Sequence, residues 1–185
     1  CEQFNKKEDS CVEDGVKRIN VVGTSASGKS TFSKALAQKL GLSYIELDDL
    51  FWLDDWVEST DELFLEKIQK EMDRAVGGYV IDGNYDTRSH VIKWKEIDAV
   101  IWLDLPFHIN LFRSVKRALL RVISKQKLWP NSNNRESLRM ILTKDSIIWW
   151  MIKTHKKNQH KYLQMMQSNE YAHIHWIRLC SRSEI

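Results

Sequence analysis

The segment from Gly23 to Ser30 reads G-x-x-x-x-G-K-S, and it constrains the fold of this 185-residue chain more than any other feature. An apolar run precedes it, and a stretch with helical character follows it over 29–40. A glycine-rich turn between a buried strand and a helix directs successive N–H groups inward, and the helix N-terminus adds unpaired donors. Such a turn grips phosphate groups. The pattern therefore predicts a strand–loop–helix unit that binds a polyphosphate.

The residue types in this loop define their expected roles. The expected nucleotide-binding residues of the loop are Gly23, Thr24, Ser25, Ala26, Ser27, Gly28, Lys29, Ser30 and Thr31. Lys29 carries the charge that reaches the β- and γ-phosphates, and the Ser30 hydroxyl is the expected ligand of Mg²⁺. We therefore expect ATP as phosphoryl donor and Mg²⁺ as its cofactor. A strand–helix turn without a ligand is the alternative interpretation of this segment.

Length and composition favour one domain. With 43% hydrophobic residues, the chain can bury a sizeable core over 17–185, whereas 1–16 is charged and patternless and is expected to be a flexible tail. No apolar run approaches 18 residues, so we expect no membrane span. Three cysteines without metal-ligand spacing, and no visible secretory signal, favour a reducing, cytoplasmic location.

Charge is distributed unevenly along the chain. Residues 113–161 contain thirteen Lys and Arg against two acids, whereas the rest of the chain is net acidic and the total is +3. A strongly basic segment predicts contact with a polyanion. A nucleotide is one such polyanion and nucleic acid is another. A solvated helix face is the alternative for most of these residues.

Apolar runs alternate with helical patterns along the chain. We expect strands at 18–22, 43–47, 79–82, 99–104 and 174–179, and helices at 29–40, 60–76, 87–95, 107–124 and 135–167, with a loop at 48–60. The apolar positions expected to face the core from the second helix are Leu63, Phe64, Ile68, Met72 and Val76. Strand–helix alternation with continuous apolar strands predicts an α/β fold, a parallel sheet covered on both faces.

The expected strand ends bring acidic residues to one edge. Asp48, Asp82 and Asp104 follow the second, third and fourth strands, and the phosphate loop follows the first. Because ligands of open parallel sheets bind at the carboxyl ends of the strands, we expect a site there. Each aspartate on its own could equally be a polar residue that ends a buried strand.

Several motifs together resemble a known family. They are Val21–Thr31, Glu46–Trp52 followed by Trp56, Ile81–Tyr85, Val100–Pro106, and the segment 127–139 with Asp145, Ser146 and Trp149 beyond it. Over 18–180 the chain resembles the adenylate kinase-like P-loop proteins, which are often described as DNA topology modulation proteins or AAA-type ATPases. The combination of Asp-Gly-Asn-Tyr with Asn-Arg-Glu-Ser is more specific than the phosphate loop alone.

The resemblance implies a P-loop NTPase fold of the nucleoside-monophosphate-kinase type. This fold has a five-stranded parallel sheet in the order 2-3-1-4-5, helices on both faces and a helical lid, here at about 125–140. The resemblance assigns Asp82 to Mg²⁺, Arg113 and Arg117 to the transferring phosphates, and Arg135 in the lid to the nucleotide. Asp48 is similar in position to an acceptor-binding aspartate of shikimate-type kinases. The remaining expected substrate-binding residues are Trp52, Asn84 and Arg88.

These expectations converge on a small kinase that transfers the γ-phosphoryl group of Mg-ATP to an unidentified small molecule or nucleotide. The catalytic residues would be Lys29, Arg113, Arg117 and Asp48, since phosphoryl transfer needs positioning and charge neutralisation.

Other functions stay open at this point. A nucleotide-dependent nucleic-acid-binding or regulatory ATPase would use tryptophans interspersed in the basic segment, such as Trp129 and Trp149, to stack on bases. The apolar run 147–152 instead favours burial or a partner surface. The carboxylate of Asp104 is also similar to that of a motor ATPase, and the acidic loop 46–58 lacks the spacing of a calcium loop.

Overall fold

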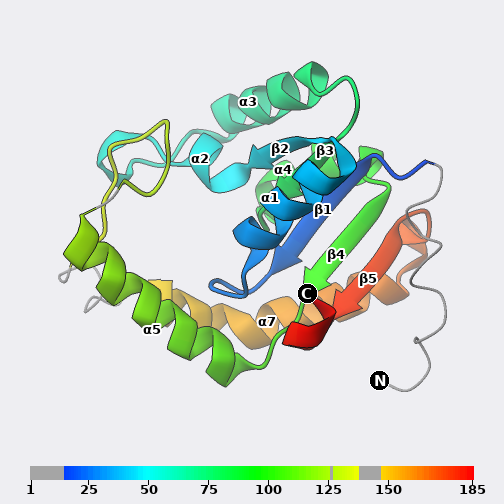
Figure 1. The fold of residues 1–185 in the computed structure, drawn as a ribbon. Coiled ribbons are helices and arrows are strands. Elements are labelled where there is room, and N and C mark those ends of the chain that lie inside the picture. The colour runs from blue at the N-terminus through cyan, green and yellow to red at the C-terminus, as the bar shows by residue number, and fades with distance from the viewer. Residues whose placement is uncertain (1–14, 126, 138–146) are drawn as a thin grey trace.

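Five parallel strands form a single sheet in the order β2-β3-β1-β4-β5 (Figure 1). The computed structural model describes residues 15–125, 127–137 and 147–185. The strands are β1 (Arg18–Gly23), β2 (Ser43–Glu46), β3 (Tyr79–Asp82), β4 (Ala99–Leu103) and β5 (His175–Leu179). The predicted fold class and strand order are therefore confirmed, and each strand lies within one or two residues of its predicted bounds.

The central strands are buried on both faces. Val21 pairs with Asp82 of β3 and with Ile101 of β4, so β1 is hydrogen-bonded on each side. Because side chains alternate across a strand, Val21 and Val22 belong to two different clusters of buried residues, one on each face of the sheet. This double burial explains the continuous apolar runs in the sequence.

Helix α1 (Lys29–Leu40) covers one face of the sheet, and α3 (Asp61–Arg74), α4 (Asp86–Glu96) and α7 (Ile147–Gln167) pack on the other (Figure 1). Ala37 of α1 lies in the same cluster as Val21. The cluster that includes Val22 also contains Phe64, Trp94 and Tyr162. Helix α5 (Phe107–Ser124) begins after Pro106 and contacts α7. The phosphate loop projects from the carboxyl end of β1.

The ends of the helices follow local chemistry. Helix α1 ends at Gly41, whose φ of 67° lies in the left-handed region that glycine adopts without strain. The Thr60 hydroxyl accepts a hydrogen bond from the backbone N–H of Leu63 and so caps α3. Helix α3 ends at Arg74, and Val76 beyond it is 97% exposed, so its predicted place in the core is wrong. Leu63 is also exposed.

The expected loop at 48–60 contains two short helices instead, α2 (Leu47–Phe51) and η1 (Asp54–Trp56). Leu47 and Phe51 are buried, and Phe51 contacts Phe64 of α3 edge to face. Five residues cannot form a stable helix on local propensity alone, so tertiary burial stabilises α2. Two further 3₁₀ turns, η2 (Asn169–Tyr171) and η3 (Arg182–Glu184), flank β5.

The long helix predicted over 135–167 is only partly present. Residues 127–137 are an irregular segment, α7 begins at Ile147, and 138–146 lie outside the described residues. The expected tail at 1–16 likewise lies outside them except for its last two residues. Within the apolar run 147–152, Met151 is buried, whereas Trp149, Trp150 and Ile152 are exposed, which is the pattern of a helix with one inward face.

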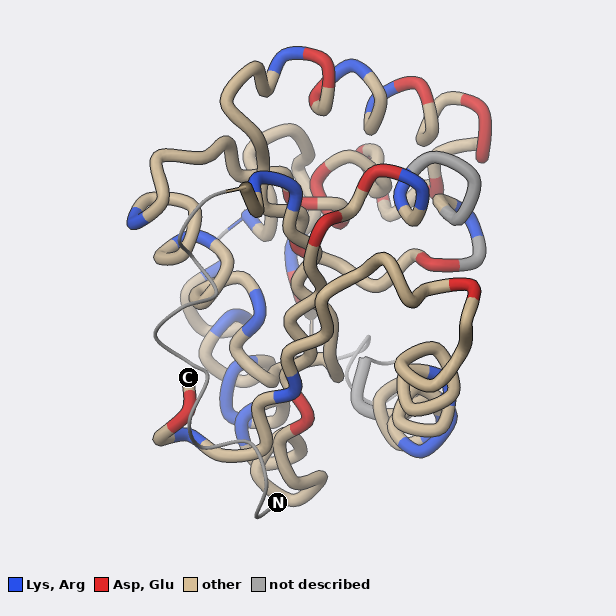
Figure 2. The backbone as a smooth tube through the Cα atoms, turned by 90° about the vertical axis from the view of Figure 1, so that its right-hand side faces the viewer, with Lys and Arg blue, Asp and Glu red and all other residues tan. Residues whose placement is uncertain are grey.

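Acidic and basic residues alternate along α3, at the top of the molecule, whereas its core positions are apolar (Figure 2). Glu71 and Arg74 form an exposed ion pair there at 2.7 Å. Because Glu66, Lys70 and Asp73 are exposed, this helix has a solvated outer face. No helix in the described ranges is long and apolar enough to span a bilayer.

Candidate nucleotide and acceptor site

The phosphate loop between β1 and α1 has the backbone that its glycines predict. Gly23 has a φ of 150°, and a Cβ atom there would lie 2.6 Å from the carbonyl oxygen of Leu103. Gly28, at the N-terminus of α1, has a φ of 100°. The first N–H groups of α1 lack partners within the helix and, with the helix dipole, favour an anion. The loop therefore provides a cradle of the kind that the sequence predicts.

The cradle is fastened to the neighbouring strand by one side chain. Asn84, two residues beyond β3, accepts a hydrogen bond from the N–H of Gly23 at 3.0 Å through Oδ1. Its Nδ2 donates to the carbonyl oxygen of Gly23 at 2.9 Å. Both polar groups of Gly23 are thereby satisfied by one amide. This geometry gives Asn84 a role in shaping the loop, and its contact with the substrate stays a prediction.

Lys29 folds back over its own loop. Its ammonium group donates to the carbonyl oxygen of Thr24 at 3.1 Å. Burial lowers the pKa of Lys29, and the carboxylates of Asp82 and Asp48 oppose that shift. Lys29 thus lies within electrostatic reach of two of the three predicted aspartates.

Both arginines of the predicted pair reach the phosphate loop from α5. Arg113 Nη1 donates to the carbonyl oxygen of Ser27 at 3.3 Å, and Arg117 Nη2 donates to the Ser25 hydroxyl at 3.2 Å. They lie four residues apart and therefore on one face of the helix. Burial lowers the pKa of Arg117, and the neighbouring Arg121 lowers it further. Two guanidinium groups and Lys29 are therefore gathered at one loop, a concentration of positive charge suited to a polyphosphate.

A histidine that the sequence did not single out also contacts the loop. His155 of α7 places Nδ1 3.1 Å from the Thr24 hydroxyl, and its ring packs against Phe107. The only signal in the sequence was its place in the basic segment. Helix α7 therefore supports the loop from the side opposite to β3.

The side of the site where the sequence predicts acceptor binding, called the acceptor side below, is formed by α2 and the start of α4. Asp48 lies in the first turn of α2 and accepts a hydrogen bond from the Tyr85 hydroxyl at 2.7 Å. Loss of hydration raises the pKa of Asp48, while the Tyr85 hydrogen bond and the Lys29 charge oppose the rise. Tyr85 in turn packs against Phe51 and Phe64. Asp48 is thus a carboxylate with a defined orientation facing the charge of Lys29.

The residues expected at Mg²⁺ are compatible with that ion. Ser30 is exposed in the first turn of α1, and Asp82 is a buried carboxylate whose Oδ2 accepts from the Tyr44 hydroxyl at 3.0 Å. Mg²⁺ takes hard oxygen ligands and completes its shell with phosphate oxygens and water. The buried hydroxyl of Ser27, in the same loop, has no hydrogen-bond partner among the described residues. No cluster of three or more metal-binding side chains occurs in that part of the chain.

Three tryptophans gather beside the acceptor side. Trp52 lies nearly parallel to Trp129, with ring centroids 6.4 Å apart, and Trp56 meets both rings edge-on. Trp129 comes from the segment 127–137, which is part of the predicted lid. The sequence named Trp52 as a substrate residue but did not foresee this cluster, because Trp129 is more than 70 positions away from Trp52 and Trp56.

Asparagines fasten the same segment to α2 and η1. The backbone and side-chain N–H groups of Asn131 both donate to Asp49, and those of Asn133 both donate to Asp54. Asn134 accepts from the N–H of Trp56 at 2.9 Å. Asp55 and Trp56 have positive φ values of 57° and 59°, which non-glycine residues adopt at a cost. These contacts hold the strained turn and the segment together.

The structure gives three predicted residues another partner or an exposed position. Arg88 forms ion pairs with Glu58 at 2.9 Å and Asp61 at 3.1 Å, so acidic side chains already occupy its guanidinium. Arg135 is exposed in the segment after α5. Asp104 follows β4 and pairs with Arg178 of β5 and with Gln159. The expected convergence of three aspartates therefore reduces to Asp48 and Asp82.

The phosphate loop after β1, the strand order 2-3-1-4-5 and the arginines of α5 define a P-loop nucleotide-binding protein with the fold of nucleoside monophosphate kinases. Residues 19–138 match the family model described as an AAA domain. Because this match covers more than half of the chain, the protein belongs to that family. The predicted relationship to adenylate kinase-like P-loop proteins is thereby confirmed.

Shikimate kinases are among the relatives. The shikimate kinase of Persephonella marina is 30% identical over 103 residues, which are 49% of this chain and 63% of that enzyme. The chain thus spans less than two thirds of the length of this curated relative. The structure of shikimate kinase from Acinetobacter baumannii in complex with shikimate superimposes with a TM-score of 0.56 at 14% identity, covering 90% of this chain and 84% of that one. This likeness shows a shared fold.

Proposed function

We propose that this protein is a small-molecule kinase that transfers the γ-phosphoryl group of ATP to an acceptor hydroxyl or phosphate. The observation that carries the proposal is the arrangement of three cations around one loop: Lys29, Arg113 and Arg117 all bond to P-loop atoms. Similarity to shikimate kinase over 103 residues supports the same reaction class.

The three cations neutralise the charge of the transferring group in this proposal. The transition state spreads negative charge over the equatorial oxygens, and fixed positive groups stabilise it more than they stabilise bound ATP. Lys29 exchanges its bond to the Thr24 carbonyl for phosphate oxygens, and the arginines exchange theirs to Ser27 and Ser25. Mg²⁺, held by Ser30 and through water by Asp82, supplies further neutralisation when bound.

Asp48 orients the acceptor. Its carboxylate is positioned by Tyr85 and lies within electrostatic reach of Lys29, so a hydroxyl hydrogen-bonded to it lies next to the phosphate cradle. A raised pKa makes the carboxylate a better proton acceptor than an aspartate with the ordinary pKa. The tryptophan cluster and the segment 127–137 close the site on this side and restrict water, whose attack on ATP is the competing reaction. The proposal also includes substrate contacts by Trp52 and by Arg88, with Arg88 released from its acidic partners. It further includes a contact between Arg135 and the nucleotide.

A screen for acceptor-dependent release of ADP tests the function. Nucleoside monophosphates and small hydroxylated metabolites are offered with Mg-ATP to the wild type, to Lys29→Met and to Lys39→Met. Lys39 is exposed in the last turn of α1 and gives the same change of charge away from the loop. We expect at least one acceptor to raise ADP release above hydrolysis, with loss in Lys29→Met and retention in Lys39→Met. Equal turnover in Lys29→Met, or release unaffected by every acceptor, contradicts the proposal.

A further inference from the structure

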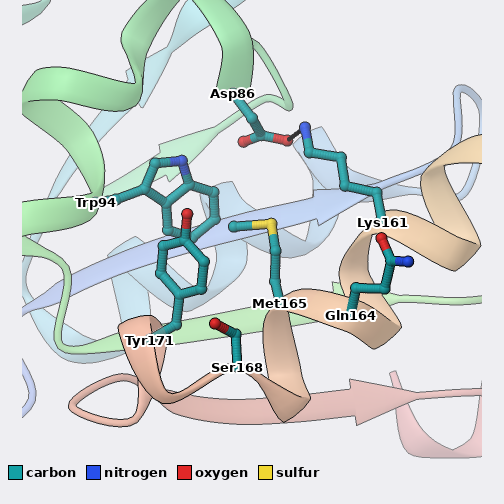
Figure 3. Close-up of a pocket in the computed structure, with 7 residues that line it drawn as sticks. All are labelled: Asp86, Trp94, Lys161, Gln164, Met165, Ser168 and Tyr171. Carbon is teal, nitrogen blue, oxygen red and sulfur yellow. Dashed lines mark hydrogen bonds and ion pairs between the residues drawn. The ribbon is translucent and has the colours of Figure 1, made fainter.

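A second pocket opens between α4, α7 and η2 (Figure 3). Its volume is about 500 Å³, within the range of small-molecule sites. The lining residues are Asp86, Trp94, Lys161, Gln164, Met165, Ser168 and Tyr171. None of them belongs to the phosphate-loop site described above, so the pocket needs an explanation of its own.

The wall of this pocket contains more positive than negative charge. The Asp86 carboxylate, 3% exposed, accepts from Lys93 Nζ at 2.6 Å, from Lys161 Nζ at 2.7 Å and from the Tyr162 hydroxyl at 2.7 Å. Burial opposes ionisation of Asp86, but the two ammonium groups outweigh it and lower its pKa. One carboxylate therefore faces two lysines, and the cluster has an excess of one positive charge.

Lys93 satisfies all of its donors inside the protein. Besides Asp86, its ammonium donates to the Asn84 carbonyl oxygen at 3.0 Å and lies 4.7 Å above the centroid of the Trp94 ring. Burial lowers the pKa of Lys93, and the Asp86 carboxylate opposes this shift. The Asp86 carboxylate, the Asn84 carbonyl oxygen and the Trp94 ring match the three N–H groups of the ammonium. Lys161, whose side chain is 35% exposed on the pocket wall, donates to Asp86 and lies 5.5 Å from the centroid of the Tyr162 ring. Of its three N–H groups, one is left for a ligand.

A second donor in the pocket lacks a partner. Trp94 is 3% exposed, and its Nε1–H makes no hydrogen bond within the described residues. Figure 3 shows this indole nitrogen on the edge of the ring that faces Asp86 and Lys161. A buried N–H without an acceptor costs about 1–3 kcal/mol, so an acceptor at this position would be stabilising. The charge excess and the unpaired donor thus favour the same kind of ligand group.

We propose that this pocket binds a small organic anion whose carboxylate or phosphate group lies against Lys161 and Trp94 Nε1. Met165 and the ring of Tyr171 supply the apolar part of the wall, so the remainder of the ligand is hydrocarbon, preferably a planar ring. The lining residues are separate from the phosphate loop, and the proposal does not rest on the proposed kinase reaction.

Indole N–H resonances of ¹⁵N-labelled protein report on this site directly. The Trp94→Phe variant identifies the Trp94 signal. Benzoate is titrated to about 10 mM, which is enough to saturate a site with a dissociation constant on the order of 1 mM. Benzamide, which has the same ring without the charge, is the matched neutral probe. Phenyl phosphate and inorganic phosphate distinguish a carboxylate site from a phosphate site.

Three variants separate the charge effect from folding. Lys161→Met removes the partly exposed ammonium group of the pocket wall. Gln164→Glu places a negative charge, the same sign as that of the ligand, on the exposed rim without changing a partner of Asp86. Lys157→Met, exposed one turn earlier in α7, is the matched control. We expect saturable shifts of the Trp94 signal with benzoate or phenyl phosphate, about tenfold weaker binding in the first two variants and no change in the third.

Any one of three results overturns the proposal. The first is the absence of a saturable shift with both organic anions. The second is binding of benzamide as tight as that of benzoate. The third is unchanged anion binding in both Lys161→Met and Gln164→Glu.

Discussion

Asn84 holds both backbone polar groups of Gly23, with its Oδ1 accepting at 3.0 Å and its Nδ2 donating at 2.9 Å. The contact joins the end of β3 to the first residue of the phosphate loop, 61 positions away in sequence. The backbone carbonyl oxygen of Asn84 accepts a hydrogen bond from the ammonium group of the buried Lys93. Residues outside the phosphate loop therefore support its shape.

Replacing Asn84 by Ala should weaken both the fold and nucleotide binding. Two partly buried hydrogen bonds are lost and the Gly23 groups lack partners, so we expect the free energy of unfolding to fall by about 1–3 kcal/mol. ATP affinity, measured by calorimetry with Mg²⁺, should fall as well, because the loop is no longer held in its binding shape. Asn84→Asp should be as damaging, since it loses the donor to the Gly23 carbonyl. Unchanged ATP affinity in a folded Asn84→Ala protein would show that the clamp has no functional role.

The arginines of α5 should affect turnover more than stability. Replacing Arg117 by Met removes a partly buried charge from the loop, and we expect phosphoryl transfer to slow by a factor on the order of 10³, the scale of arginine contributions in related reactions. Lys116→Met, on the exposed side of the same helix, should leave the rate within about twofold of the wild type. Comparable losses in the two variants would mean that net charge alone, rather than contact with the loop, governs the rate.

Titration of Asp48 should be controlled by Tyr85. Burial raises the pKa of Asp48, and the Tyr85 hydrogen bond favours the ionised carboxylate, so Tyr85→Phe should raise this pKa further. Carboxyl ¹³C NMR over pH 3 to 8 measures it, with Asp48→Asn identifying the resonance. The pKa of Asp48 is higher in the folded than in the unfolded state. Asp48 therefore adds to the free energy of unfolding at low pH, and this contribution is lost as the pH rises through the folded-state pKa. The Tyr44→Phe variant, which loses a bond to Asp82 instead, should shift the Asp48 resonance less.

The Asp86 cluster should be the most costly ion pair to break. Removing the carboxylate with Asp86→Asn leaves Lys93 buried without its counter-ion, and we expect a loss of about 3–5 kcal/mol in urea denaturation. Glu71→Gln, in the exposed pair with Arg74, should cost less than about 1 kcal/mol. The pKa of Asp86 is lowered in the folded state, so its contribution is present above the ordinary carboxyl pKa of about 3.9 and is lost as pH falls from there. Equal losses in the two variants would refute the view that burial makes this pair stronger.

The segment 127–137 should open when its acidic partners are neutralised. Asp49→Asn and Asp54→Asn each weaken two hydrogen bonds from Asn131 or Asn133. We expect faster hydrogen exchange at the backbone amides of those asparagines, by about tenfold, with little change in global stability because the contacts are exposed. Asp73→Asn, on the outer face of α3, is the control. Exchange that stays as slow as in the wild type would show that other contacts, such as the tryptophan cluster, hold the segment.

The sequence alone determined the elements whose causes are local. The helix from Lys29 to Leu40 and the helix from Phe107 to Ser124 have the bounds predicted from the phosphate loop, Gly41 and Pro106. The apolar strands predicted a parallel sheet, and the P-loop motif placed the site at its carboxyl edge. In each case, glycine, proline or a continuous apolar run restricts the backbone whatever its distant neighbours are.

Only the tertiary structure decided which of the predicted residues meet. Arg113 and Arg117 reach the loop, whereas Arg88 is paired with Glu58 and Asp61, although all three are arginines in helices near the site. Helix α2 is stabilised where Phe51 packs on α3. The wall of the second pocket brings together Asp86 and Lys161, which are 75 positions apart and form an ion pair. Such contacts depend on the relative placement of packed elements, which a one-dimensional pattern of residue types does not encode.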